Sequence, residues 1–398
     1  MNALKTTTVL FLTYIIFIPA FAQDDKKLTK SRMEVAVTQP AQKDATDENV
    51  SQLKLPAGFT IEKFAEDLGN SRMIAVRSEG SVYVTARDEG EVILLKDTNN
   101  DGKADKRSTV ATIEDVHGIH IYNDNQMYLA TVKDVYKANI KNDGTLEGLQ
   151  KIIDDLPDGG QHPNRTLAVG PDNMLYISVG STCNACEETN KEHATMLRAK
   201  IDGTEREVYA KGLRNTVGFA WHPVTKDFWG MDHNTDWLGD DEDHEDLNKI
   251  EKGKHYGWPF VYDDGQKMPH RSPPNVTFDE FVKKTTFPVL MYQPHSAPME
   301  MVFYTGDEFP EEYKNDAFVA FRGSWNRADP TGYKVCRIKF DENNNPTGFE
   351  DFITGFLLDD GNAHFGRLVG LTVYQKASLL LTDDSNGVMY KISYNKGR

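Results

Sequence analysis

One short pattern recurs six times between Arg72 and Leu368, and it constrains the fold more than any other feature of the chain. Each copy has a polar turn with an arginine or a histidine, a short apolar strand, a second turn and a second apolar or aromatic strand. The copies begin at Arg72, His117, Arg165, Arg214, His295 and Arg367. The second strands, anchored on Tyr83, Tyr128, Tyr176, Phe228, Phe318 and Leu380, are 45, 48, 52, 90 and 62 residues apart. Repeats of this length, built from several short strands, are typical of β-propeller blades.

A further alternating segment follows each copy, at residues 91–96, 135–140, 196–201, 247–250, 334–340 and 388–394. We therefore predict an all-β protein, a six-bladed β-propeller of four-stranded antiparallel blades over residues 54–398. A closed ring brings equivalent positions of all blades to one end of one axis. The recurring arginines and histidines would then form one basic pocket that suits an anionic ligand.

The first 53 residues differ from the repeats. Lys5, the apolar run 9–19 and the small-residue site Ala20-Phe21-Ala22 are typical of a secretory signal peptide that is cleaved after Ala22. Residues 23–53 are polar and contain no aromatic side chain, which predicts a flexible leader. We expect a periplasmic or secreted protein without a transmembrane domain, and a retained N-terminal anchor is the alternative.

Charge and cysteine content narrow the possible partners. The formal net charge of −16 argues against nucleic acid, whose phosphates would be repelled. Cys183 and Cys186 stand in a Cys-Asn-Ala-Cys sequence, which in an exported chain favours a small-loop disulfide. Zinc would need two further ligands at a suitable spacing, and we find none. Cys336 lies on the apolar face of an alternating strand, which predicts a buried thiol.

Two acidic segments could bind calcium. The run 232–246, in the longest repeat, offers side-chain and backbone oxygens, but for Asp240–Asp246 we favour a solvated acidic loop. The segment Asp97–Asp105 begins like a calcium loop, but Ser108 stands where the bidentate glutamate belongs. A calcium-stiffened turn and a plain Asn/Asp/Gly turn are both open there. Extra loops at 232–246 and 255–274 over a rigid scaffold are expected to carry function.

Three residues are candidates for chemistry. His162 precedes an inner strand, where a histidine can act as a general base near neutral pH, and a turn-capping histidine is the alternative. Arg214 and Asn215 occupy the equivalent position of the next repeat, where a planar guanidinium beside an amide suits a carboxylate or a quinone oxygen. An arginine that ties neighbouring blades together is the alternative.

Six motifs, in this order, resemble the glucose/sorbosone dehydrogenase family, and most closely its sorbosone and pyranose dehydrogenase branch. They are HPNRTLAVGPD (162–172), GSTCNACEE (180–188), GLRN (212–215), KHYGWP (254–259), HSAP (295–298) and GSWNR (323–327). The resemblance covers roughly residues 53–396. It implies a six-bladed propeller that holds pyrroloquinoline quinone (PQQ) together with calcium.

The resemblance also implies roles for individual residues. His162 matches the catalytic histidine, which takes the proton of the sugar hydroxyl. The remaining matches are quinone contacts for Arg214 and Asn215, cationic cofactor contacts for Arg327 and Arg367, polar cofactor contacts for Thr182 and His117, and calcium-binding backbone carbonyls for Asn234 and Thr235. Together these matches predict an exported PQQ-dependent sugar dehydrogenase that acts on an aldose or a pyranose.

The chain departs from the family pattern at three points. Gln161 stands where soluble glucose dehydrogenases have an aspartate, so glucose is not the expected substrate. Asn234-Thr235 replaces a Gly-Pro pair, which the site tolerates because backbone carbonyls do the binding. The chain has no Cys-x-x-Cys-His haem motif, so electrons would pass to a separate acceptor such as a cytochrome or a quinone.

Two other functions remain as alternatives. A non-catalytic propeller would bind a glycan or a protein partner on the same face. A calcium-dependent lactonase-type hydrolase would need carboxylates and asparagines on the axis. The recurring position holds arginine and histidine instead, which disfavours the hydrolase.

Overall fold

The computed structural model describes residues 35–395, and these residues are built almost entirely from β-strands, as predicted. Most of the strands belong to six four-stranded antiparallel sheets within the described residues. The first three sheets are β3 (Ser71–Val76), β4 (Val82–Ala86), β5 (Glu91–Lys96) and β6 (Lys106–Thr112); β7 (Gly118–Tyr122), β8 (Gln126–Ala130), β9 (Val135–Ile140) and β10 (Leu146–Ile153); and β11 (Leu167–Val169), β12 (Met174–Val179), β13 (Thr195–Lys200) and β14 (Glu207–Lys211). The other three are β15 (Thr216–Trp221), β16 (Phe228–Asp232), β17 (Glu245–Lys249) and β20 (Leu290–Tyr292); β21 (Pro298–Phe303), β22 (Ala317–Phe321), β23 (Lys334–Phe340) and β24 (Pro346–Ile353); and β27 (Leu368–Tyr374), β28 (Ser378–Asp383), β29 (Val388–Tyr394) and β2 (Phe59–Ala65).

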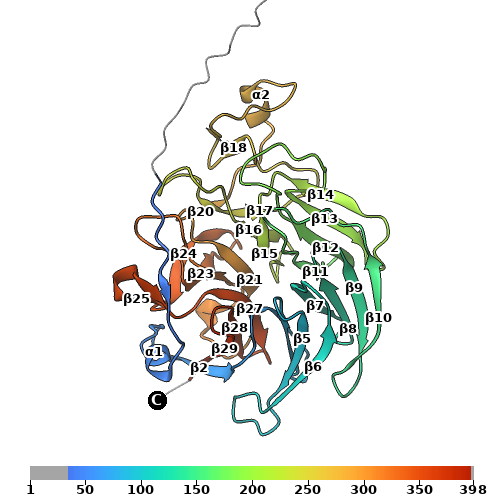
Figure 1. Ribbon diagram of the computed structural model, residues 1–398, viewed down its shortest axis with the longest axis vertical. Coiled ribbons are helices and arrows are strands. Elements are labelled where there is room, and N and C mark those ends of the chain that lie inside the picture. Colours follow the sequence, from blue (N-terminus) through green and yellow to red (C-terminus); the bar gives the residue numbers. More distant parts are fainter. Residues whose placement is uncertain (1–34, 396–398) are drawn as a thin grey trace, which may run out of the picture. The chain divides into compact units, whose positions relative to one another are not determined.

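The sheets are arranged around a common centre (Figure 1). Neighbouring sheets touch near their first strands, in the order β3–β7, β7–β11, β12–β15, β15–β21, β21–β27 and β27–β3. A cavity of about 300 Å³ is lined by residues of all six first strands. A single cavity with this lining means that the first strands surround one axis.

Strand β2 comes from the N-terminal end of the domain but pairs with β29, from its C-terminal end. The last sheet is therefore completed by residues at opposite ends of the described chain, and this pairing closes the ring. The predicted anchors all lie in the second strand of their sheets, and none is more than 5% exposed. Their burial explains why the aromatic and aliphatic positions repeat, because each one fills the space between two sheets.

The predicted leader differs from the structure over residues 41–53. Strand β1 (Ala41–Gln42) pairs in parallel with β26 (Ala363–His364), which also pairs with β25 (Leu357–Leu358). Helix α1 (Asp47–Ser51) follows, and its Val50 is buried in a cluster that includes Phe59 and Tyr313. These residues are part of the folded domain because their few apolar side chains find a core to join. The predicted signal peptide and residues 23–34 lie outside the described residues.

The longest insertion stands between β17 and β20. It carries β18 (Val261–Tyr262), β19 (Gln266–Lys267) and α2 (Phe278–Val282), whose N-cap Thr277 forms a capping box with Glu280. Short 3₁₀ helices occur at Glu311–Tyr313 and Asp359–Gly361. No helix among residues 35–395 is long and apolar enough to cross a membrane.

Two smaller predictions can be compared with the structure. Cys336 is fully buried, as predicted, and burial raises the pKa of its thiol to about 12. In the turn between β5 and β6, the Asp97 carboxylate accepts from the Gly102 N–H at 2.9 Å, and Asp105 accepts from the Thr98 hydroxyl. Hydrogen bonds within the segment therefore hold this turn together, as in an Asn/Asp/Gly turn.

Candidate functional site

His162 lies in the segment between β10 and β11 and is largely buried. Its Nδ1 is 2.8 Å from the Ser181 carbonyl oxygen and 2.9 Å from Ser181 Oγ. A carbonyl only accepts hydrogen bonds, so we assign the imidazole proton to Nδ1, which leaves the Nε2 lone pair available as a base. Burial, and then the positive charge of Arg214, lowers the pKa of His162 to about 3. The ring is thus neutral at physiological pH, in the tautomer that a general base needs.

Asn215 lies beside His162, as its motif predicted. A Cβ added to Gly180 would lie 2.5 Å from His162 Cβ and 2.7 Å from Asn215 Oδ1, so both side chains close over this glycine. The Asn215 N–H donates to Asp232 Oδ1 at 2.8 Å, and the Arg214 N–H donates to Asp232 Oδ2 at 2.7 Å. The end of β16 therefore fixes the backbone that carries the Arg-Asn pair.

The Arg214 side chain is fully buried and bound to protein groups. Its Nε donates to the Asn184 carbonyl at 3.0 Å, Nη1 to the His233 carbonyl at 2.9 Å, and Nη2 to Asp236 at 3.0 Å. These bonds tie the loop after β12 to the loop after β16. In this geometry Arg214 joins two neighbouring sheets, and its quinone contact stays a prediction.

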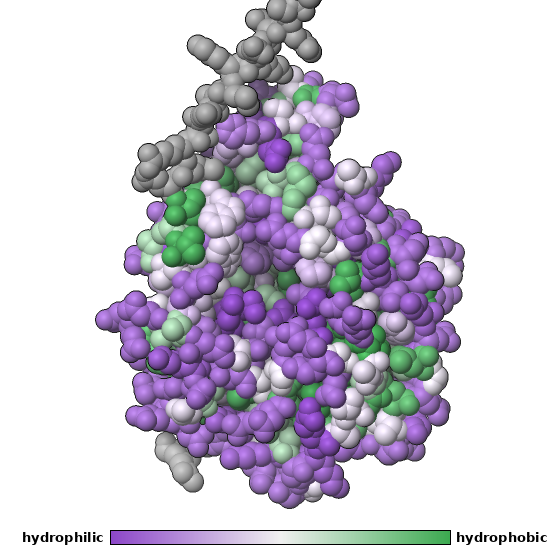
Figure 2. All heavy atoms as spheres, viewed as in Figure 1, coloured by the Kyte–Doolittle hydropathy of each residue, from purple (hydrophilic) through white to green (hydrophobic). Residues whose placement is uncertain are grey.

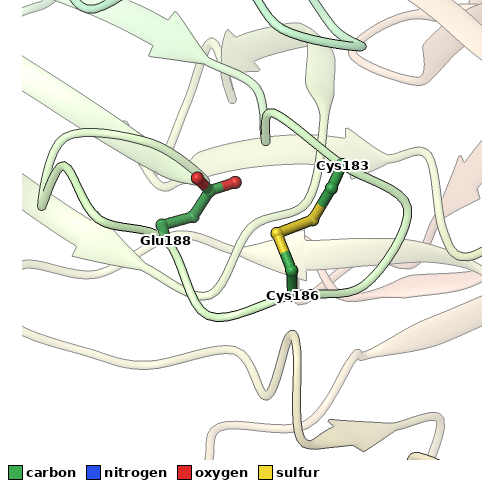
Figure 3. A group of neighbouring side chains, drawn as sticks. All are labelled: Cys183, Cys186 and Glu188. Carbon is green, nitrogen blue, oxygen red and sulfur yellow. A yellow bond between two sulfur atoms is a disulfide. The ribbon is translucent and has the colours of Figure 1, made fainter.

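The loop after β12 contains the Cys183–Cys186 disulfide (Figure 3), as predicted. Glu188 lies next to it and accepts from the Thr182 N–H at 2.6 Å and from the Thr182 hydroxyl at 2.8 Å. That hydroxyl donates its proton inside the loop, so the predicted cofactor contact of Thr182 would use it as an acceptor. The loop acts on the base instead, since Ser181 both holds His162 and donates to the Cys183 carbonyl at 2.7 Å.

A group of basic side chains converges near His162. The pKa of His233 is held well below its usual range by burial, and then by the neighbouring basic groups Arg214, His162, His295 and Arg322. These five side chains come from segments far apart in the sequence, and the axial arrangement brings them together. The space-filling view shows a largely hydrophilic face with a hollow near its centre (Figure 2). His233 was not among the predicted site residues, although it directly precedes Asn234 and Thr235.

Arg367 belongs to the same basic region. Its Nε is buried without a hydrogen-bond partner among the described residues, and burial, followed by the charge of Arg322, lowers the pKa of the guanidinium. Asp384 is the principal acid here, and it pairs with Arg322 at 2.8 Å and with Arg72. Unused donors and an excess of positive charge make this region suitable for an anion with several carboxylates.

Two predicted cofactor contacts are used inside the protein. His117 is fully buried, with Nδ1 3.1 Å from the Arg165 carbonyl and Nε2 3.4 Å from Arg72. Arg327 is 6% exposed and donates to the carbonyls of Asp329 and Asp240. Within residues 35–395, Nη2 of Arg327 makes only a 3.7 Å ion pair with Asp241. The cofactor contacts of His117 and Arg327 therefore stay predictions.

The predicted calcium-binding pair lies directly after β16. Neither the Asn234 nor the Thr235 carbonyl accepts a hydrogen bond from another residue within 35–395. The Asn234 N–H donates to Glu245 at 2.9 Å, and the Thr235 N–H donates to Asp243 at 2.9 Å. Two adjacent unpaired carbonyl oxygens are donors of the kind that calcium accepts, so the residues present fit the predicted ion.

The prediction of a solvated acidic loop over Asp240–Asp246 is wrong for part of that segment. Asp243, Glu245 and Asp246 are only 2%, 1% and 6% exposed, whereas the side chain of Asp241 is 94% exposed. The reason is strand β17, which begins at Glu245 and pairs with β16 and β20. The strand pairing carries these carboxylates into the interior.

Comparison with known proteins agrees with this picture. A sequence profile of the TrAA12-like family matches residues 53–395. An uncharacterised protein of Borreliella burgdorferi is 30% identical over 371 residues, which are 88% of this chain and 93% of that protein. A calcium structure of a family AA12 carbohydrate-active enzyme from Trichoderma reesei has a TM-score of 0.78 at 21% identity and covers 90% of this chain and 98% of that one. The holo form of the pyranose dehydrogenase PQQ domain from Coprinopsis cinerea has a TM-score of 0.74 at 19% identity and covers 90% and 100%. The two solved structures share the fold, and the family match over most of the domain shows that the chain belongs to the TrAA12-like family.

Proposed function

We propose that this protein is an exported, PQQ-dependent sugar dehydrogenase that oxidises an aldose or pyranose hydroxyl, and that its six sheets are the blades of a propeller. The observation that carries the proposal is the free Nε2 of His162 beside a convergent group of basic side chains. Two similar proteins, the pyranose dehydrogenase of Coprinopsis cinerea and the aldose sugar dehydrogenase of Escherichia coli, are named for this chemistry. The disulfide agrees with an oxidising compartment.

The cofactor would lie over the basic region at the axis. Arg367 and Arg322 would bind its carboxylates, and the carbonyls of Asn234 and Thr235 would hold the calcium ion. When bound, PQQ supplies a two-electron acceptor for hydride, and calcium polarises the accepting carbonyl. Asn215, which faces Gly180 next to His162, would orient the ligand that lies between them.

His162 would perform the proton transfer. Its Nδ1–H donates to the Ser181 carbonyl, which fixes the ring. Nε2 would take the proton of the sugar hydroxyl while hydride leaves the carbon that bears this hydroxyl. The low pKa keeps Nε2 unprotonated, and the negative charge of a bound cofactor would raise that pKa toward the working range. The sugar becomes a lactone, acid or keto product, and the electrons leave to a separate acceptor.

The first experiment is a titration of the metal-stripped protein with PQQ, with and without Ca²⁺, followed by a panel of sugars with an artificial electron acceptor. We expect calcium-dependent binding and sugar-dependent reduction. His162→Ala should lower kcat by about 10²- to 10⁴-fold, the usual contribution of a general base, and leave PQQ binding intact. A matched control is His270→Ala, at an exposed histidine of the insertion.

Two results would contradict the proposal. A folded protein that binds no PQQ at micromolar concentration would favour the non-catalytic binding propeller. A His162→Ala variant that keeps more than a tenth of the parent turnover would remove the base assigned here.

A further inference from the structure

A group of buried polar side chains lies in β17 and just before it, and one of them contacts the loop that follows β16. Its members are the carboxylates of Asp243 and Asp246 and the amide of Asn248, which are 2%, 6% and 1% exposed. The Thr235 N–H donates to Asp243 Oδ2 at 2.9 Å, which anchors the loop to this group.

The strand register places Asp246 and Asn248 on one face. They are two residues apart in β17, and side chains alternate along a strand, so both point to the same side. Asp246 is paired with Asp232 of β16, whose carboxylate is already satisfied by the Arg214 and Asn215 N–H groups and by the Thr216 hydroxyl. The carboxylate of Asp232 therefore adds negative charge to this face, and it has no N–H or O–H group that could donate to the other oxygens.

Three oxygens of the group lack a partner. Oδ1 of Asp243, Oδ1 of Asp246 and Oδ1 of Asn248 are buried and accept no hydrogen bond. Within residues 35–395, no lysine or arginine forms an ion pair with Asp243 or Asp246, whereas nearby Asp236 pairs with Arg214. The Asn248 amide oxygen cannot be protonated, so it needs a donor or a cation, and it has no hydrogen-bond partner among residues 35–395.

Electrostatics point the same way. Asp243 and Asp246 are both buried and carry charges of the same sign. Two carboxylates that destabilise each other in the interior are costly unless a cation lies between them. Buried carboxylate and amide oxygens without donors are what a hard divalent cation binds.

We propose that Asp243, Asp246 and Asn248 form a structural calcium site that is separate from the cofactor's calcium ion. Calcium takes six to eight oxygens, so the second carboxylate oxygens and water would complete the shell. The Thr235 N–H donates to Asp243, so the structural site contacts the loop that carries the proposed ligands of the cofactor's calcium ion. Occupancy of the structural site would therefore fix the loop that carries the cofactor's calcium ligands.

The test uses the full-length protein without PQQ, stripped of metal with EDTA and then titrated with Ca²⁺. We expect calcium binding by calorimetry and a rise of roughly 3 °C or more in Tm at saturating Ca²⁺, because a ligand that binds only the folded state stabilises it. Asp243→Asn and Asp246→Asn should each bind one equivalent of calcium fewer than the parent and lose that rise. Asp241→Asn makes the same charge change in the exposed part of the loop and should behave like the parent.

Thermal melting in EDTA shows whether each variant is folded in the absence of calcium. Without calcium, Asp246→Asn removes a buried charge, so it should stay folded and melt at or above the temperature of the parent. The inference is overturned if the PQQ-free parent binds no Ca²⁺, or if both variants respond to Ca²⁺ as the parent does. A parent that binds Ca²⁺ but not PQQ would refute the proposed function and leave the structural site standing.

Discussion

Glu300 gives the sharpest prediction about stability, because it is a carboxyl group in the axial cavity that the proposed reaction does not use. It lies in β21, and the cavity of about 300 Å³ that it lines is otherwise largely apolar, with Ile74, Ile119 and Trp221 among its neighbours. Burial raises the pKa of Glu300 from 4.5 to about 8, and the Met301 N–H is too weak a partner to offset it. The side chain is therefore protonated in the folded protein at neutral pH.

The sign of the pH effect follows from this shift. Between pH 4.5 and 8 the folded state holds a proton on Glu300 that the unfolded state has lost, so the free energy of unfolding falls as pH rises through that window. A shift from 4.5 to about 8 is worth at most about 5 kcal/mol at 1.36 kcal/mol per pH unit. Water in the cavity would screen part of this, so we expect about 2–4 kcal/mol.

The perturbation is Glu300→Gln, which keeps the shape and removes the titration. Urea unfolding at pH 4.5 and at pH 8.5 gives the free energy of unfolding of each protein. Between these two pH values, this free energy should fall by about 2–4 kcal/mol more in the parent than in the variant. Glu62→Gln, an exposed glutamate of β2, is the control and should follow the parent. Parallel pH profiles for the parent and Glu300→Gln would refute the reasoning, since they would mean that Glu300 titrates alike in the folded and unfolded states.

Three further predictions concern the proposed active site. Gly180→Ala should lower sugar turnover at least about tenfold and cost about 1–3 kcal/mol of stability, because the new Cβ would lie 2.5 Å from His162 Cβ; initial rates and urea unfolding check both. Reduction of the Cys183–Cys186 disulfide, or Ser at both positions, should have a larger effect on activity, measured as kcat, than on thermal stability, measured as Tm, because the loop orients the base. An unchanged kcat would contradict this. Arg367→Ala should weaken PQQ binding by about 10- to 150-fold, the usual value of a hydrogen bond to a charged group of about 1.5–3 kcal/mol, as a fluorescence titration would show.

Local patterns were sufficient to predict the sheets. The alternation around Tyr83 or Phe318 is visible within ten residues, and the structure places both in the buried second strand of a sheet. Residues 41–53 were mispredicted because Val50 and Leu53 are isolated apolar residues in a polar segment. Their burial depends on a cluster with Phe59 that no local pattern reveals.

The acidic run shows the same limit in the site. The composition of the run predicts that Asp243 and Asp246 are exposed to solvent, because charged segments usually are. The pairing of Asp246 with Asp232 overrides this, because it fixes the strand whatever the charge of its side chains. Register is a long-range property of the sheet, and so the buried oxygens with no donor could not be predicted from the run itself.

Arg214 and Arg367 show why residue type and repeat position together do not determine a ligand contact. Both start a repeat copy, and the family resemblance gives both a cofactor role. Arg214 is surrounded by the loops after β12 and β16, whose carbonyls and Asp236 use its donors, so it stabilises the site from within. The Arg367 side chain has a buried Nε without a hydrogen-bond partner among residues 35–395. The loops after β12 and β16 make this difference, and two single variants would measure it: if both arginines only bound ligand, their effects on PQQ affinity would resemble each other. We expect instead that Arg214→Lys lowers Tm first and PQQ affinity second, while Arg367→Lys lowers affinity with little change in Tm, because the buried arginine holds protein groups and the unpaired one is free to hold an anion.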